Sequence, residues 1–198
     1  MGLDKGEKVP AWYVTERLQA MDYMKIKLDS LYGRMKLFKG TESKPHYRLA
    51  GDQLNMLDEL IIAKEKGKFS KGYIHATKFI KAYDWFFTCH FYQDPVMPGS
   101  LGVESIIQAM QVFALQQDLG KDFQSPRFVQ VPHHKTVWKY RGQILSTAKE
   151  MHLEVHIKSI DRKGNQLLMV ADAFLWNDKI RIYQVTDLAL GIEEAIEK

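Results

Sequence analysis

The chain has 198 residues, 45% of them hydrophobic and 12% aromatic, which suffices for one packed domain with an appendage. No apolar run approaches the ~20 residues that a membrane-spanning helix needs, and the N-terminus MGLDKGEKVP has no apolar segment of a secretory signal. The single cysteine, Cys89, excludes an internal disulfide framework and a CxxC zinc site. We therefore expect a cytoplasmic protein with no membrane partner.

The formal net charge is +4, and the lysines are spread along the chain instead of forming runs. Such a distribution is typical of an ordinary solvated surface, so no nucleic-acid partner is expected. A modest positive charge is also compatible with an acidic protein partner.

The N-terminal part is predicted to be one long helix over residues 11–38, because apolar residues recur there at steps of three and four. This stripe consists of Val14, Leu18, Met21, Met24, Leu28, Leu31, Met35 and Phe38. Residues 39–52 are polar and contain two glycines and a proline, which indicates a connector. The predicted division is residues 1–50, helix and connector, and residues 51–198, the main domain.

The main domain opens with two predicted strands, at residues 55–63 and 72–80, followed by a short helical turn at 84–87. Residues 101–119 then form a predicted helix that is apolar on most sides, which is typical of a buried helix. Gly120 is a natural end for it.

From Arg127 onward the pattern predicts strands. Met151, Leu153, Val155 and Ile157 alternate with polar residues, which is the period of a strand with one buried face. Short turns at 162–165 and 177–179 favour antiparallel hairpins. The sequence therefore predicts an α+β domain in which a curved antiparallel sheet wraps one central helix.

Candidate chemistry lies in residues 85–108, WFFTCHFYQDPVMPGSLGVESIIQ. His90 falls in a turn-rich loop, and Glu104 follows near the start of the buried helix. A histidine and a carboxylate can act as an acid and base pair, and the free N–H groups of a helix start can hold a carbonyl oxygen that gains negative charge. Gln108 lies one turn after Glu104 and could hydrogen-bond to it. Cys89 is interpreted as a small buried packing residue.

His133 and His134 are adjacent, but no third ligand has suitable spacing, so no metal site is expected.

The segment CHFYQDPVMPGSLGVESIIQ resembles the active-site segment of the β-hydroxydecanoyl-acyl carrier protein dehydratases, and in particular the related dehydratase domains of polyunsaturated fatty acid synthases. The likeness covers residues 51–192 and includes NMLDEL, KGYI, HKTVWKYRGQIL and TDLALGI. It implies a hotdog fold, which agrees with the predicted elements. It also implies a dimer or pseudo-dimer of hotdogs, in which the histidine of one meets the carboxylate of the other.

The resemblance implies β-elimination of water from 3-hydroxyacyl thioesters carried on the phosphopantetheine of an acyl carrier protein. The family's catalytic positions correspond to His90 and Glu104. Gly99, whose N–H matches the family position that contacts the thioester carbonyl, and Gln108 are the expected substrate-binding residues. Neither a metal nor a redox cofactor is expected, because elimination moves only protons.

One departure bears on the product. Family members that also isomerise the double bond typically carry aspartate where this chain has Glu104, so dehydration to a trans-2-enoyl product is expected and trans-2 to cis-3 isomerisation is left open. Two alternatives are a hotdog thioesterase or hydratase, and a non-catalytic structural half of a tandem dehydratase.

Overall fold

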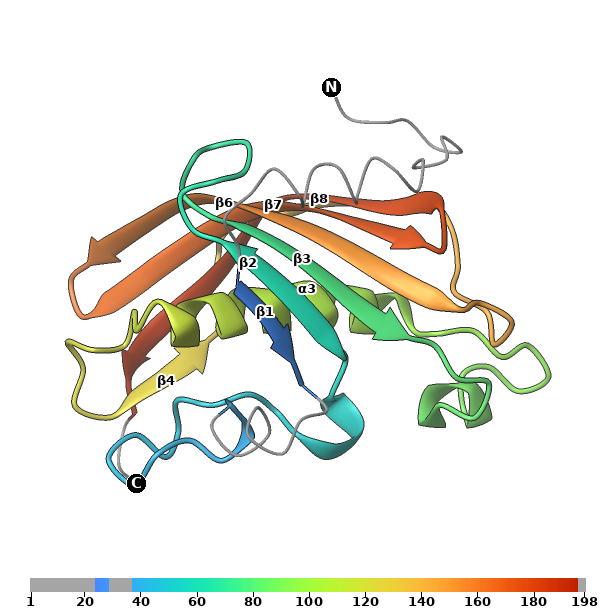
Figure 1. Ribbon diagram of the computed structural model, residues 1–198, viewed down its shortest axis with the longest axis horizontal. Helices are drawn as coiled ribbons and strands as arrows, with labels where there is room; N and C mark the ends of the chain where they lie inside the picture. The colour runs from blue at the N-terminus through green and yellow to red at the C-terminus, as the bar shows by residue number, and fades with distance from the viewer. Residues whose placement is uncertain (1–23, 29–36, 196–198) are drawn as a thin grey trace.

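An antiparallel sheet of eight strands crosses one long helix in the computed structural model, which describes residues 24–28 and 37–195 (Figure 1). The helix is α3 (Gly99–Gln116), and two short 3-10 helices are η1 (Asp52–Leu54) and η2 (Trp85–Thr88). The strands are β1 (Met24–Lys27), β2 (Glu59–Ala63), β3 (Tyr73–Phe79), β4 (Pro126–Val129), β5 (Val137–Tyr140), β6 (Glu150–Lys163), β7 (Gln166–Asn177) and β8 (Ile180–Glu194).

The sheet has the order β1-β2-β3-β6-β7-β8-β4, and β5 pairs with β8 beyond the stretch that β4 occupies. The long strands β6, β7 and β8 follow one another as hairpins, as the short turns predicted. Gly164 turns the first hairpin with a φ of +57°, a conformation that glycine adopts without steric cost. The α+β architecture expected from the sequence is therefore confirmed.

Helix α3 supplies the centre of the core, because most of its sides are buried against the sheet (Figure 1). On β6, the alternating residues Met151, Leu153, Val155 and Ile157 are all fully buried. A helix that is buried on most sides is stable only inside such a wrap of apolar strands. The helix begins two residues earlier than predicted and ends at Gln116.

The predicted helix over residues 11–38 is wrong at residues 24–27, which form β1 and pair with β2 from Met24–Ile62 to Lys27–Glu59. The tetrapeptide MKIK alternates apolar and charged residues, so it satisfies a strand period as well as the helical spacing. Lys25 also forms an ion pair with Glu59 at 3.0 Å. Leu28 lies in a turn, Leu37 and Phe38 are helical, and the remaining positions of that prediction, 11–23 and 29–36, lie outside the described residues.

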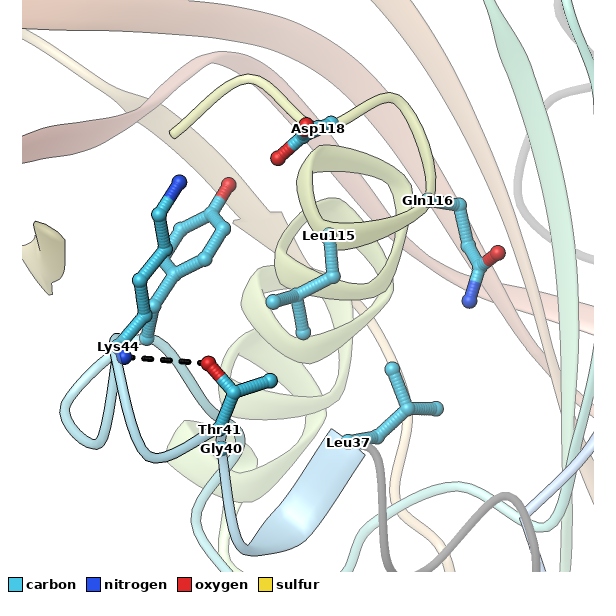
Figure 2. A pocket seen from close by; sticks show the side chains of 8 residues that line it. Leu37, Gly40, Thr41, Lys44, Leu115, Gln116 and Asp118 are labelled. Carbon is cyan, nitrogen blue, oxygen red and sulfur yellow. Dashed lines mark hydrogen bonds between the residues drawn. The ribbon is translucent and has the colours of Figure 1, made fainter. Parts of the chain in front are cut away.

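The predicted connector at 39–52 packs on the main domain. Tyr47 and Leu49 are 5% and 1% exposed and belong to the core. A small pocket of about 110 Å³ lies where this segment meets the C-terminal end of α3, between Thr41 and Lys44 on one side and Leu115 on the other (Figure 2). The division at residue 50 stays a prediction. Residues on its N-terminal side do join the main domain, because β1 pairs with β2 and Tyr47 and Leu49 belong to the core.

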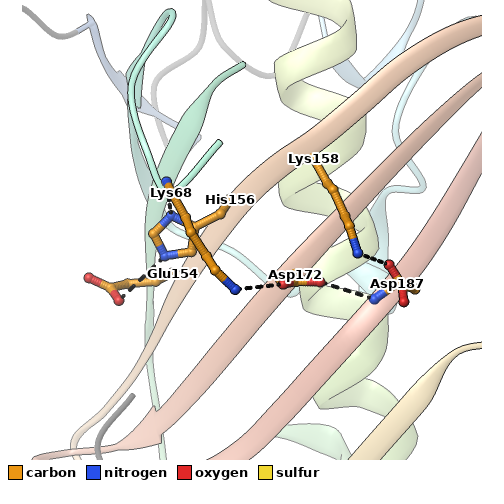
Figure 3. A network of polar contacts seen from close by, with 6 residues as sticks. All are labelled: Lys68, Glu154, His156, Lys158, Asp172 and Asp187. Atoms are coloured by element: carbon orange, nitrogen blue, oxygen red, sulfur yellow. Dashed lines mark hydrogen bonds and ion pairs between the residues drawn. The ribbon is translucent and has the colours of Figure 1, made fainter. Parts of the chain in front are cut away.

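The sheet face that points away from α3 carries a polar network, to which the loop between β2 and β3 contributes (Figure 3). The Lys68 backbone N–H donates to His156 Nδ1 at 3.2 Å, and the Lys68 ammonium pairs with Asp172 at 3.3 Å. Asp172 in turn accepts the backbone N–H of Asp187, whose carboxylate pairs with Lys158. These bonds allow polar side chains such as His156 and Asp172 to be buried without losing their partners.

Among the described helices, none is long and apolar enough to cross a membrane.

Candidate active site

Backbone groups of neighbouring residues hold both the main chain and the ring of His90. The 3-10 helix η2 ends just before it, and the His90 N–H donates to the Phe86 carbonyl at 3.0 Å. Its ring Nδ1 lies 3.0 Å from the Val96 carbonyl oxygen, while the Val96 N–H donates to the His90 carbonyl at 2.8 Å. Because a carbonyl oxygen only accepts, Nδ1 carries the hydrogen. In the neutral ring Nε2 is then the unprotonated nitrogen, available as a base.

The residues after His90 leave apolar side chains in solvent. The Phe91 ring stacks on the His90 ring with a centroid separation of 3.8 Å, and the peptide bond between them is cis. Phe91 is 58% exposed and Tyr92 is 90% exposed. Two exposed aromatic side chains therefore directly follow the candidate base.

Helix α3 begins with an N–H that has no partner in the part of the chain that the structure describes. Pro98 is the N-cap residue and makes no side-chain cap, and the Gly99 N–H donates to no group within the described residues. The first N–H groups of a helix are unsatisfied by its own carbonyls and carry the positive end of the helix dipole. The Gly99 N–H is therefore available to an acceptor oxygen from outside the helix.

Three aromatic residues of β5 and β8 hold this helix start. The Tyr183 hydroxyl donates to the Gly99 carbonyl at 3.2 Å, and the rings of Trp138 and Tyr140 lie within 5.5 and 5.1 Å of its ring, between centroids. Burial, with a smaller effect of Tyr140, raises the pKa of Tyr183 above its ordinary value, so the hydroxyl stays protonated and can donate. A Cβ atom at Gly99 would lie 3.0 Å from Tyr140 and 3.1 Å from Trp138.

Glu104 lies in the second turn of α3, and Gln108 holds its carboxylate. The amide of Gln108 donates to Glu104 Oε1 at 2.9 Å, which is the hydrogen bond expected from their spacing. Gln108 is 1% exposed, and its amide also binds the Leu54 carbonyl and the Met56 N–H. Its role as a substrate-binding residue stays a prediction, since these three hydrogen bonds all go to groups of the protein itself.

The chain does not bring its own His90 and Glu104 into contact. No hydrogen bond or ion pair joins them within the described residues, and each has separate partners. Cys89 is exposed and not buried as expected, with only weak contacts from its thiol to the Trp85 and Phe86 carbonyls. No group of three or more potential metal ligands occurs in the part of the chain that the structure describes.

Sequence reasoning missed two parts of this site, the aromatic residues around Gly99 and the loop that binds Gln108. Tyr183 and Gly99 are 84 positions apart and Leu54 and Gln108 are 54 apart, so no local pattern connects them. The motif KTVWKYR did single out Trp138 and Tyr140, but only as ordinary strand residues.

The family model of the FabA-like domain matches residues 49–186, so the chain belongs to the FabA-like family. Together with the central helix and antiparallel sheet, this membership identifies a hotdog fold. The resemblance seen in the DPVMPG segment is confirmed.

The chain is 38% identical over 194 residues to a polyunsaturated fatty acid synthase protein of Thraustochytrium sp. (strain ATCC 26185 / S-3). The match covers 96% of this chain but only 13% of that protein. Among solved structures, the dehydratase heterocomplex ApeI:P from Xenorhabdus doucetiae aligns with a TM-score of 0.49 and 9% identity, over 77% of this chain and 90% of that chain.

Proposed function

We propose that this chain dehydrates 3-hydroxyacyl thioesters, carried on the phosphopantetheine of an acyl carrier protein, to trans-2-enoyl thioesters during fatty acid or polyunsaturated fatty acid synthesis. The observation that carries the proposal is the tautomer of His90, because its bond to Val96 leaves Nε2 as a base in the same segment as Glu104 and the Gly99 N–H. Family membership supports the same reaction class.

Each proton in the reaction has a carrier. His90 Nε2 takes the proton from C2 of the substrate, and the C2 electron pair forms the double bond to C3 as the C3–O bond breaks. Protonated Glu104 gives its proton to the departing hydroxyl, which leaves as water. The Gly99 N–H donates to the thioester carbonyl oxygen while it gains negative charge. Transfer of the proton from His90 to Glu104 restores the starting state.

The reaction transfers no electrons to an acceptor, so the proposed mechanism uses no metal or redox cofactor. Isomerisation of the trans-2 product to cis-3 would need two further proton transfers, removal of a proton from C4 and delivery of a proton to C2. Glu104 is one methylene longer than the aspartate of isomerising relatives, and proton transfer is sensitive to displacements of ~1 Å. We therefore propose dehydration as the main activity.

A second hotdog domain is the proposed partner at β5. All four residues of β5 are exposed, and the strand pairs only with β8 among the described strands. Three of them are apolar or aromatic and are each 42–43% exposed, namely Val137, Trp138 and Tyr140. An open strand edge with such side chains favours pairing with another chain. A partner at this edge would cover the apolar surface around His90 and bring its own Glu104 or His90 to complete each site.

The acyl carrier protein is proposed to approach along basic residues next to the site. Lys135 and Lys139 are exposed, and Arg141 is partly exposed, on and beside β5. Positive charges around an active site steer an acidic partner toward it. This part of the proposal depends on charge alone, and we expect added salt to weaken the encounter.

Mass spectrometry of a 3-hydroxyacyl thioester incubated with the protein tests the proposal. We expect the wild type to remove one water, His90→Ala and Glu104→Gln to lose this activity, and His46→Ala, a change of an exposed histidine in the connector, to retain it. Chromatography against standards distinguishes trans-2 from cis-3 products.

Release of the free acid would support a thioesterase instead. No reaction by the wild type alone, with activity restored by another hotdog domain, would support the structural-half alternative.

A further inference from the structure

The end of η1 and the first residues after it contact both η2, which precedes His90, and α3, which carries Glu104. Residues 53–56, here called the bridge segment, lie between these two elements. The bridge segment makes hydrogen bonds to each through its backbone.

On the His90 side, the Trp85 indole N–H donates to the Gln53 carbonyl at 2.8 Å. The same residue anchors the end of η2, because its carbonyl accepts the Thr88 hydroxyl at 2.6 Å. The next carbonyl, that of Phe86, accepts the His90 N–H. The indole of Trp85 therefore fixes the bridge segment against the backbone that positions His90.

On the Glu104 side, the Leu54 carbonyl accepts from the Gln108 amide, and the Met56 N–H donates to Gln108 Oε1 at 3.1 Å. These two bonds set the orientation of the buried amide, whose remaining hydrogen bond goes to Glu104 at 2.9 Å. An amide held at both ends has one orientation, so it directs its N–H at one carboxylate oxygen.

Met56 of the bridge segment and Phe86 of η2 are both fully buried in the core, and a pocket lies beside them. This polar pocket of about 220 Å³ is lined in part by Gln53, Asn55, Met56, Trp85 and Phe86. The indole hydrogen bond joins the two sides of this pocket, because Trp85 lies on η2 and Gln53 belongs to the bridge segment.

We propose that Trp85 is a positioning residue, which acts through the bridge segment and Gln108 to set the carboxylate of Glu104. The expected effect of Trp85 on catalysis rests on the proposed function, whereas its structural link to Gln108 does not. If each site takes His90 from one hotdog and Glu104 from another, the bridge within one chain links two different sites. A change at one site then alters the geometry of the other.

Trp85→Phe tests this proposal, because it removes the indole N–H and retains an aromatic ring. Trp176→Phe is the matched control, since Trp176 is buried in the sheet and its indole N–H has no hydrogen-bond partner among the described residues. Two quantities are measured in the full chain: amide hydrogen exchange at Met56, by NMR or on peptides covering residues 53–58, and kcat and KM for dehydration.

For Trp85→Phe we expect exchange at Met56 to become about fivefold faster, which corresponds to loss of one ordinary hydrogen bond. We expect kcat to fall about three- to tenfold with KM changed less than about twofold, because positioning affects the transition state more than binding. Trp176→Phe is expected to change neither quantity.

Unchanged exchange at Met56 would overturn the bridge whether or not the protein is a dehydratase. Faster exchange with an unchanged kcat would overturn the positioning role. If the wild type fails to dehydrate, the proposed function fails, while the exchange measurement still decides whether Trp85 holds the bridge segment.

Discussion

At the scale of single residues, the proposed chemistry depends on side chains whose orientation the backbone sets. His90 and Gln108 each bind backbone groups from their own loop or from residues 54–56, so their active atoms point in defined directions. Such preorganised groups need no rearrangement when charge develops during reaction.

Replacing Gln108 by Met tests how much the fold depends on this buried amide. The variant keeps the size of the side chain but removes the partner of the buried Met56 N–H and of the partly buried Leu54 carbonyl. We expect a loss of about 2–4 kcal/mol in the free energy of unfolding, measured with urea. Gln116→Met, at the partly exposed end of the same helix, should change it by less than about 0.5 kcal/mol. Equal effects would contradict the network.

His75 gives the fold a dependence on pH that is separate from catalysis. Burial, with a smaller effect of the stacked His152, lowers the pKa of His75 to about 4. The unfolded chain, with a pKa of about 6.5 for this group, binds the proton more readily, so stability is complete above pH 6.5, falls as pH drops toward 4 and then levels off.

We expect this single group to account for a loss on the order of 3 kcal/mol between pH 6.5 and 4. His75→Phe should remove that part of the slope in urea titrations at a series of pH values. His46→Phe changes an exposed histidine and should retain the slope. If the free energy of unfolding of His75→Phe depended on pH as steeply as that of the wild type, other groups would cause the dependence.

At the scale of elements, α3 and β8 approach so closely that one position admits only glycine. A Cβ atom at Gly102 would overlap the ring of Tyr183. Helix propensity alone favours alanine over glycine by about 1 kcal/mol. We expect the overlap to outweigh it, so that Gly102→Ala destabilises the protein by about 1–3 kcal/mol in thermal or urea unfolding.

The double variant Gly102→Ala, Tyr183→Ala separates the two effects. Without the ring, alanine at position 102 should become neutral or stabilising. A cost that persists in the double variant would assign it to the helix backbone and not to Tyr183.

The elements that the sequence predicted well are those whose period is strict over many residues. Helix α3 and strand β6 are examples, because burial on most sides or on one face leaves a regular pattern. The sequence of strand β1 does not distinguish strand from helix, because four residues are too few to separate the two periods. Its hydrogen bonds go to β2, which lies more than thirty residues further along the chain.

In the candidate site, too, contacts between residues close in sequence could be predicted, and contacts between distant residues could not. The spacing of Glu104 and Gln108 predicted their hydrogen bond, since residues four apart meet on a helix. The contact of Tyr183 with Gly99 depends on the path of β8 past the helix start. Neither residue carries a local sequence pattern that indicates this contact, so it is seen only in the folded structure.

At the scale of the whole molecule, the exposed edge of β5 is the proposed docking surface for a second hotdog domain. Val137→Lys places a charge on this edge without removing the aromatic residues that hold the start of α3. We expect it to shift the protein toward a monomer in light scattering with an unchanged circular dichroism spectrum, because charges on edge strands oppose pairing.

Ile180→Lys is the control for that variant, since Ile180 is 46% exposed at the start of β8, outside β5. It should leave the assembly state unchanged. Assembly of the Val137→Lys protein at wild-type affinity would place the partner surface elsewhere.

The most direct test of a shared active site mixes two inactive variants, His90→Ala and Glu104→Gln, in one preparation and measures dehydration of a 3-hydroxyacyl thioester. Shared sites predict recovery of about one quarter of wild-type activity, because half of randomly formed pairs contain one intact site of two. Each variant alone should be inactive. A mixture as inactive as its components, beside an active wild type, would contradict a site built from His90 of one hotdog and Glu104 of another.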